Sequence, residues 1–411
     1  MRMRKILKSG IVAATLSVAM GHSALADNIV MWVNSPLLAG PNAPLHQELK
    51  AFEAATGHTV EVQAVSHMEM ERNLFVALSS GAGPDVMALD IAWVAGLADA
   101  GLLLDITEQT KPIAAEYQPG PFASGRYGQK QYALPLYTNN VALFVNDQML
   151  EQAGIKKAPT TWAEFRDAAV AMTNKDKQTY GVSFGGSRMG AFQLYSYIWQ
   201  NGGEIVDNQG KSRVSEPAAV EAVDFLAKLY TQNRAMPESV LTAGNWDEVH
   251  APFIQERAGM VVTGDWALAA FAKGNPKLKF SVHPLPSGIQ AATVIGGYDL
   301  AIKADTKFPK ASFELIRWLT GPRSVELMRK YERLSATTAA TTPEAVAALP
   351  KPLQPFMSQA ATGRARPVIA SWTQIHSDVF GNVWDSVIRG KPAKDAMSEA
   401  DIAIKRLLEK K

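Results

Sequence analysis

Short apolar runs alternate with amphipathic segments along the first part of the chain. The runs at 28–33, 60–65 and 85–90 predict strands, and residues 45–54 and 68–79 between them carry apolar side chains at helical spacing. A strand–helix–strand–helix–strand order favours a parallel sheet with right-handed crossovers. The pattern therefore predicts an α/β fold.

The alternation continues to the end of the chain. Two strand-like runs, 132–137 and 141–145, lie close together and are separated by residues 138–140. Further strands are expected near 180–184, 259–263, 280–282 and 300–302. Helices are expected at 217–230, at 308–319, and from 375 to 408 with a break at 390–392.

Length and composition narrow the class of protein. A chain of 411 residues is too long for one ordinary core and suggests two domains. The composition, 47% hydrophobic and 19% charged, is that of a soluble globular protein. The 41 basic and 39 acidic residues nearly balance, so nucleic acid is not an expected partner.

The N-terminus has the pattern of a secretory signal peptide. Basic residues precede the apolar run 11–20, and Ala24-Leu25-Ala26 follows as a cleavage site before Asp27. We therefore expect residues 1–26 to be removed and the mature protein to be periplasmic. The chain has no Cys, which excludes an N-terminal lipid anchor, disulfides and a Cys-type zinc site.

Polar and aromatic residues follow the predicted strands, where ligands bind in open α/β sheets. Asp90 ends a buried run, and an unpaired buried carboxylate is costly. We expect a visiting ligand hydroxyl, rather than a buried cation, to satisfy it. Trp32, Trp199 and Trp318 lie in apolar patterns that indicate the core. The positions that follow strand or loop ends are Asn34, Ser35, Ser66, His67, Asp90, Trp93, Tyr137, Asn139, Trp266, Gly297, Tyr298 and Trp372.

One enzyme motif leaves an alternative open. Residues 181–185 match the G-x-S-x-G pattern of a hydrolase nucleophile, which makes a secreted serine hydrolase using Ser183 the alternative of another class. The residues before the motif look like a loop rather than the strand that this turn requires, and no pattern marks His250, His283 or His376 as a base. No metal-binding spacing or nucleotide-binding motif is present, so we expect no catalytic residues, no metal and no cofactor.

Several short motifs, taken in order, carry a family resemblance. They lie at 79–86, 97–103, 132–135, 153–162, 201–205, 264–266, 284–286, 296–298 and 366–367. With them the chain resembles the extracellular solute-binding proteins of ABC sugar importers, of the maltose/trehalose type. The resemblance implies a type II periplasmic-binding-protein fold, with two α/β lobes, a hinge and an interlobe cleft. It places the N-terminal lobe at 27–138 plus 297–332 and the C-terminal lobe at 139–296 plus 333–411, and the chain is expected to cross between the lobes near 138–141, 294–298 and 331–335.

The same resemblance implies a ligand site. Asp90 and Trp93 match an element that binds sugar hydroxyls, and Asn139 stands after Tyr137 where the family has an acid. Trp266 matches a stacking face, and Gly297 and Tyr298 match a Gly-Gly-aromatic element. Arg366, rather than the nearby Arg364, matches a ligand-binding Arg, and Gly186 and Trp372 complete the candidate set with Asn34, Ser35 and Ser66.

The expected function is therefore that of a periplasmic substrate-binding component. It would capture a sugar or sugar derivative by hinge closure and deliver it, as a monomer, to the membrane permease subunits of an ABC transporter. The planar guanidinium of Arg366 raises the hypothesis that the ligand is anionic. A non-sugar solute such as glycerol phosphate is the alternative on the same scaffold.

Overall fold

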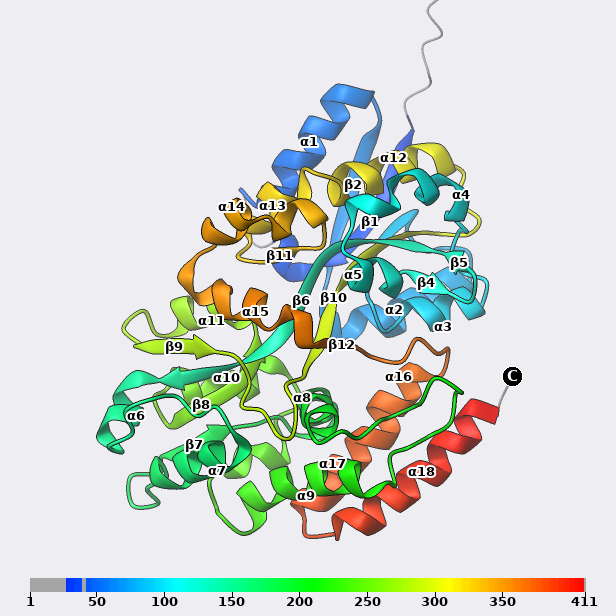
Figure 1. The fold of residues 1–411 in the computed structure, drawn as a ribbon. Helices are drawn as coiled ribbons and strands as arrows, with labels where there is room; N and C mark the ends of the chain where they lie inside the picture. The colour runs from blue at the N-terminus through cyan, green and yellow to red at the C-terminus, as the bar shows by residue number, and fades with distance from the viewer. Residues whose placement is uncertain (1–26, 39–41, 410–411) are drawn as a thin grey trace, which may run out of the picture.

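The computed structural model describes residues 27–38 and 42–409, and it shows two α/β lobes joined by long strands (Figure 1). This confirms the predicted fold class. The expected signal peptide, 1–26, lies outside the described residues. None of the helices in the described ranges combines the length and the apolarity needed to cross a bilayer.

Strands of both lobes join in one sheet with the order β2-β1-β3-β10-β6-β8-β7. The parallel pairing of β1 with β2 and with β3 confirms the predicted parallel arrangement of the first strands. The strands are β1 (Asn28–Asn34), β2 (Thr59–Val65), β3 (Val86–Asp90), β4 (Arg126–Tyr127), β5 (Lys130–Gln131), β6 (Ala133–Asn146), β7 (Tyr180–Ser183), β8 (Ala258–Gly264), β9 (Phe280–His283), β10 (Thr293–Ile302), β11 (Leu334–Ser335) and β12 (Gly363–Ala365).

Helices cover the sheet, and each lobe has a core of its own. α1, α2, α3, α12 and α13 pack against the first strands, whereas α7, α8, α9, α17 and α18 surround the core of the other lobe. The helices are α1 (Pro44–Thr56), α2 (His67–Ser79), α3 (Val94–Asp99), α4 (Thr107–Thr110), α5 (Pro119–Ser124), α6 (Asp147–Gln152), α7 (Trp162–Ala171), α8 (Ser187–Gln200), α9 (Pro217–Thr231), α10 (Trp246–Ile254), α11 (Ala267–Gly274), α12 (Pro309–Thr320), α13 (Ser324–Lys330), α14 (Pro343–Ala347), α15 (Gln354–Ser358), α16 (Trp372–Gln374), α17 (Gly381–Ile388) and α18 (Ala393–Glu409).

Two long strands, β6 and β10, run from one lobe into the other (Figure 1). The first half of β6 pairs with β10 and its second half with β8 and β9. The sequence suggested two strands separated at 138–140, but β6 is continuous there. Its polar residues are held because β10 pairs with Thr138–Asn140 on one side and β11 pairs with Tyr137 and Thr138.

Gly297 is fixed by a close approach between these crossing strands. Its φ is +143°, and a Cβ atom there would lie 2.4 Å from the carbonyl oxygen of Tyr137. Only glycine adopts this backbone at no steric cost. Gly297 therefore lets β10 lie close to β6 at Tyr137 and Thr138, where β11 also pairs with β6. We expect the hinge at this junction.

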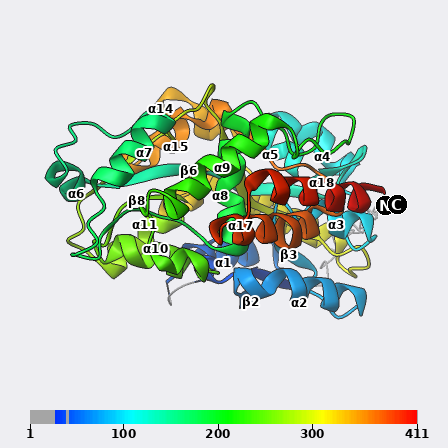
Figure 2. The same ribbon diagram turned by 90° about the horizontal axis from the view of Figure 1, so that it is seen from below.

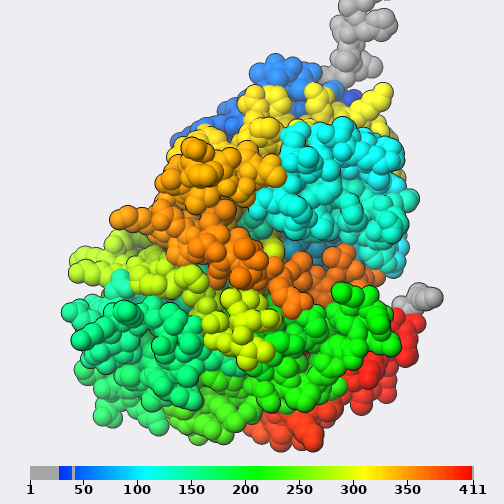
Figure 3. Space-filling model, viewed as in Figure 1, coloured from blue at the N-terminus to red at the C-terminus, as the bar shows by residue number. Residues whose placement is uncertain are grey.

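The two lobes meet along a waist, which the segment containing α15 and β12 (orange) spans on the face seen in Figure 3. β12 pairs with the start of β10, at Thr293–Ile295, and so leads the chain back across the junction. The three predicted crossings, near 138–141, 294–298 and 331–335, thus lie on neighbouring strands. The residue boundaries of the lobes stay a prediction.

Candidate ligand-binding site

A cavity of about 710 Å³ lies between the lobes at the crossing strands. Its walls come from the carboxyl ends of β1 and β3 and the start of α2 in one lobe, and from α8, α10 and the turn after β8 in the other. The structure brings together at this cavity the candidates Asn34, Ser35, Ser66, His67, Asp90, Trp93, Tyr137, Asn139, Trp266, Gly297, Tyr298, Arg366 and Trp372.

Gly186 is the candidate that does not line this cavity. It precedes α8, and a Cβ atom there would come within 2.7 Å of the carbonyl oxygen of Val240. Its role is to let two backbone segments approach. The neighbouring Arg188 lines the cavity instead.

Aromatic rings form two groups on opposite walls. In the C-terminal lobe, Trp266 lies 5.0 Å from Trp246 and 6.2 Å from Phe192, measured between ring centroids. The indole of Trp266 folds back over Gly264, where a Cβ atom would lie 1.9 Å from the ring. The Gly-x-Trp spacing thus has a local cause, because only glycine leaves room for the ring.

The second aromatic group is built on the N-terminal lobe and the crossing strands. His67 stacks on Trp93 at 5.2 Å, and Tyr137 stacks on Tyr298 at 5.5 Å. Flat apolar faces on both walls suit the C–H surfaces of a small polyhydroxylated ligand.

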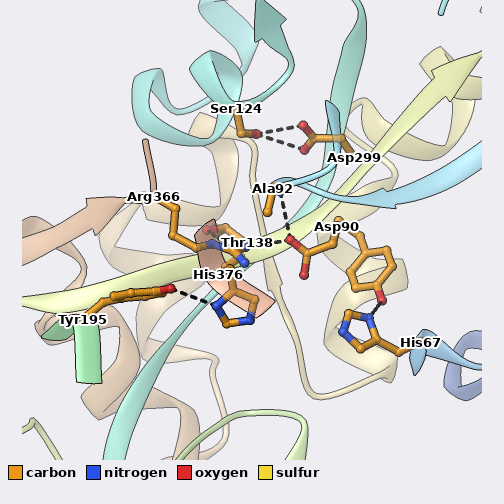
Figure 4. Close-up of polar contacts among 11 residues, drawn as sticks. His67, Asp90, Ala92, Ser124, Thr138, Tyr195, Asp299, Arg366 and His376 are labelled. Carbon is orange, nitrogen blue, oxygen red and sulfur yellow. Dashed lines mark hydrogen bonds and ion pairs between the residues drawn. The ribbon is translucent and has the colours of Figure 1, made fainter. Parts of the chain in front are cut away.

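Asp90 has a buried cation as its partner. Nη2 of Arg366 donates to Oδ1 of Asp90 at 2.7 Å, and the side chains of Arg366 and Asp90 are 5% and 16% exposed (Figure 4). The expectation that a ligand hydroxyl rather than a cation satisfies Asp90 was therefore wrong. Burial raises the pKa of Asp90, but the charge of Arg366 and the hydrogen bonds to the carboxylate outweigh it, so the pKa is lowered and the carboxylate stays ionised.

One oxygen of Asp90 carries both protein hydrogen bonds. Oδ1 also accepts from the backbone N–H of Ala92 at 2.9 Å, and within the described ranges Oδ2 has no protein donor. Figure 4 shows Oδ2 turned away from Arg366. The pair therefore orients the carboxylate and leaves one acceptor for a ligand.

Two neutral histidines flank this carboxylate. Nδ1 of His67 bonds the hydroxyl of Tyr298, and Nδ1 of His376 bonds the hydroxyl of Tyr195 at 2.9 Å (Figure 4). Burial lowers the pKa of His67, and it lowers the pKa of His376 to about 3. Each imidazole is thus an uncharged hydrogen-bonding group with its ring held by a tyrosine.

Arg333 and Asp265 add a second charged pair at the junction. Asp265 is fully buried, and Nη1 of Arg333 lies 3.6 Å from its Oδ1. Burial raises the pKa of Asp265 to about 6 although Arg333 acts to lower it. Arg333 also lines the cavity and lies within the predicted third crossing, 331–335.

Several lining residues were missed by the sequence analysis. His376, Arg188, Phe192 and Trp246 lie within predicted or observed helices rather than after strands, so a rule based on strand ends does not find them. Arg333 lies within a predicted crossing between the lobes, so the sequence did contain a signal that could have identified it.

Five of the fifteen buried side-chain N and O atoms that lack a hydrogen bond in the described residues belong to residues that line the cavity. Within the described residues, Nε1 of Trp266 and of Trp372, Nε of Arg366, and the side-chain oxygens of Asn34 and Asn139 are buried without a hydrogen bond. Buried polar groups normally find a partner. The five residues therefore leave hydrogen-bonding capacity beside the cavity that the described residues do not satisfy.

The arrangement around Ser183 is not that of a hydrolase. Its hydroxyl is buried and donates to the carbonyl oxygen of Val249 at 2.6 Å. His250 bonds Thr263, and His283 bonds Ser281, so neither is placed to act as the base of Ser183. In the ranges 27–38 and 42–409, no cluster of three or more His, Asp or Glu residues is arranged to hold a metal ion.

Comparison with known proteins places this geometry in a family. The chain is 25% identical to a binding protein of Brucella abortus over 97% of this chain and 98% of that protein. It is 24% identical to a maltotriose-binding protein of Pyrococcus abyssi over 72% of this chain and 63% of that protein. An ABC transporter solute-binding protein of Thermotoga lettingae, solved with bound alpha-D-tagatose, has the same fold: the TM-score is 0.83 at 23% identity, over 93% of this chain and all of that one.

The family model described as bacterial extracellular solute-binding protein matches residues 35–326, which is more than half of the chain. The match includes the first two crossing strands and the Asp90 and Trp266 walls of the cavity. The chain therefore belongs to the bacterial extracellular solute-binding protein family.

Proposed function

We propose that this protein is the substrate-binding component of an ABC importer and that its ligand is a sugar or sugar derivative. The observation that carries the proposal is the interlobe cavity, whose two walls offer aromatic faces and unpartnered polar atoms. The bound sugars of related proteins, alpha-D-tagatose and maltotriose among them, support the same class. The expected signal peptide supports a periplasmic location.

The Asp90–Arg366 pair favours a neutral ligand group beside it. The guanidinium of Arg366 is compensated by Asp90, so it is not a free clamp for an anion. Oδ2 of Asp90, to which no described residue donates, accepts a sugar hydroxyl. The hypothesis of an anionic sugar loses the basis on which it was raised.

The mechanism is closure of the two lobes around the ligand. β6, β10 and β11 meet at Tyr137–Thr138, where small changes in backbone angles rotate one lobe against the other. A ligand that contacts both walls stabilises the closed arrangement through its differential affinity for that state. The closed form, acting as a monomer, is then the one presented to the permease.

The test is a binding panel read by thermal shift and calorimetry. It contains neutral mono-, di- and trisaccharides and polyols, with uronic acids and glycerol 3-phosphate as anionic members. A ligand at 1,000 times its Kd stabilises the fold by about 4 kcal/mol through mass action. We expect a neutral sugar to give this effect, and stabilisation by the anionic members alone would overturn the proposed ligand class.

A pair of tryptophan variants separates a loss of ligand binding from a general loss of fold stability. Trp266→Ala removes a ring of the cavity wall, whereas Trp318→Ala removes one from α12, which the cavity does not touch. Binding should fall for the first and persist for the second. Scattering in solution should show compaction on ligand addition in the wild type, and a constant radius of gyration with a tight ligand would exclude the closure mechanism.

A further inference from the structure

A second hollow opens beside the ligand cavity. This side groove, of about 850 Å³, lies between α2 and α3 of one lobe and residues 368–374 of the other, with the end of α18 alongside. Figure 2 shows α18 next to α3, on the side where α2 lies. Glu71, Trp93 and Thr373 line both the side groove and the ligand cavity, so the two hollows adjoin at these residues.

The side groove gathers exposed apolar side chains. Phe75 is 51% exposed, Val76 64% and Val368 42%. These are three of the seven large hydrophobic residues that are exposed in the described part of the chain, and all three line this groove. Such clustering next to a binding site marks a surface that something apolar covers.

Further closure of the lobes would not cover the exposed apolar side chains of the side groove. At the groove the walls already touch, since a Cβ atom on Gly96 of α3 would lie 3.1 Å from the carbonyl oxygen of Ala370. The Asp90–Arg366 pair likewise spans the lobes in this arrangement. The side groove is therefore open in an arrangement in which the two sides are already in contact.

The two hollows differ in the chemistry of their walls. The ligand cavity presents paired aromatic rings and unpartnered polar atoms, which suit sugars. The side groove adds aliphatic surface from Val76, Leu97, Val368 and Ile369, and its Tyr127 hydroxyl is already bonded to Asp99 at 2.7 Å. Aliphatic surface suits alkyl or aryl groups better than it suits further sugar rings.

We infer that the ligand is a glycoside whose sugar occupies the ligand cavity and whose apolar alkyl or aryl substituent lies in the side groove. This inference rests on the proposed function. The substituent leaves the sugar between Trp93 and Thr373, where the two hollows join. The occupant is thus part of the transported ligand rather than a second molecule.

The test compares glycosides that differ only in the substituent. Calorimetry would use methyl, n-hexyl and phenyl glucosides and galactosides in both anomers, with 1-hexanol, maltose and maltotriose as further probes. We expect the hexyl or phenyl form of one sugar to bind at least about tenfold more tightly than its methyl form, the gain that corresponds to burying a few methylene groups. 1-Hexanol alone should not bind, because the sugar supplies the anchoring contacts.

Two variants test whether the gain in affinity from the hexyl or phenyl group arises in the side groove. Phe75→Ser with Val76→Ser changes exposed groove residues, and Ile289→Ser changes a 76% exposed residue outside both hollows. The groove variant should lose the tenfold gain while its affinity for the methyl glycoside is unchanged, and the Ile289 variant should keep the gain.

Each outcome decides between the two proposals. Equal binding of methyl and hexyl forms, or a gain that survives in the groove variant, overturns the apolar substituent but leaves the sugar-binding function standing. A larger gain from maltose to maltotriose that the groove variant abolishes shows that the groove takes sugar units instead. Absence of binding for every sugar and glycoside overturns the proposed function itself.

Discussion

Replacing Arg366 with Met removes the cation beside Asp90 and keeps much of the length of the side chain. The pair is buried, with side chains 5% and 16% exposed and 2.7 Å between Nη2 and Oδ1. Removing one partner of a buried pair costs about 3–5 kcal/mol, because it leaves the other charge uncompensated. Asp90 keeps its bond from the N–H of Ala92, so we expect a loss of about 3 kcal/mol at pH 7.

The pH dependence of this loss has a definite sign. In the wild type the pKa of Asp90 is lowered, so the ionised carboxylate supports the fold above its unfolded pKa of about 3.9, and the support is lost as pH falls through the folded value. In Arg366→Met, burial remains and its main opposing charge is gone, so the pKa rises. Protonation then relieves the variant on acidification, and its deficit relative to the wild type should shrink between pH 7 and pH 4.

The assay is urea unfolding followed by tryptophan fluorescence, which the nine Trp residues make sensitive. Arg364→Met is the matched control, two positions away. Its guanidinium pairs with Glu204 at 2.5 Å, but the side chains are 40% and 33% exposed, so it should cost at most about 1 kcal/mol. Asp90→Asn combined with Arg366→Met should recover part of the loss, because no charge is left uncompensated.

Two results would refute this reasoning. A cost for Arg366→Met no larger than that for Arg364→Met would mean that the buried pair is not coupled to stability. A deficit that stays constant from pH 7 to pH 4 would mean that the uncompensated carboxylate is not its cause.

Three further predictions follow from single side chains. Trp266→Ala should weaken sugar binding about thirtyfold by calorimetry, the loss typical of a central tryptophan, while unchanged affinity would remove the stacking role. Ser183→Ala should cost about 1 kcal/mol in urea unfolding, the loss of one hydrogen bond to Val249, and should leave ligand affinity unchanged; labelling of Ser183 by a fluorophosphonate would contradict this. Burial raises the pKa of Asp299 to about 8, so the wild type should lose stability as pH rises from about 4 to about 8; Asp299→Asn should flatten that slope in thermal unfolding, and an unchanged slope would assign it to other groups.

Local pattern predicted the elements well where periodicity decides them. The strands and helices up to Asp90 follow from alternation and glycine stops, and the observed α1, α2 and β3 end within two residues of the predicted bounds. Pattern failed at 138–140, where polar residues looked like an interruption. Their place in β6 depends on pairing with β10 and β11, which lie more than 150 residues away in the chain, and local sequence does not contain that pairing.

The strand-end rule identified one part of the candidate site and missed another. Carboxyl ends of neighbouring parallel strands meet at one edge, so Asn34 and Asp90, which end β1 and β3, could be placed together from topology alone, whereas Trp266 follows a strand of the other lobe. His376 lies in a helical segment far along the chain, and only the packing of that segment against α8 brings it beside Asp90. A rule based on strand ends does not identify a residue that a helix contributes.

The pairing of Asp90 with Arg366 changes how the site is prepared for its ligand. A carboxylate at the end of a buried strand would shift toward its neutral form if only burial acted on it. Arg366 keeps it ionised and engages one oxygen, so the second oxygen is presented in a fixed direction before any ligand arrives. Ordering an acceptor in advance lowers the entropic cost of binding. Because Arg366 follows β12 and Asp90 ends β3, the same contact also ties the segment after β12 to the end of β3, and so holds the acceptor in place from two parts of the chain that are far apart in sequence.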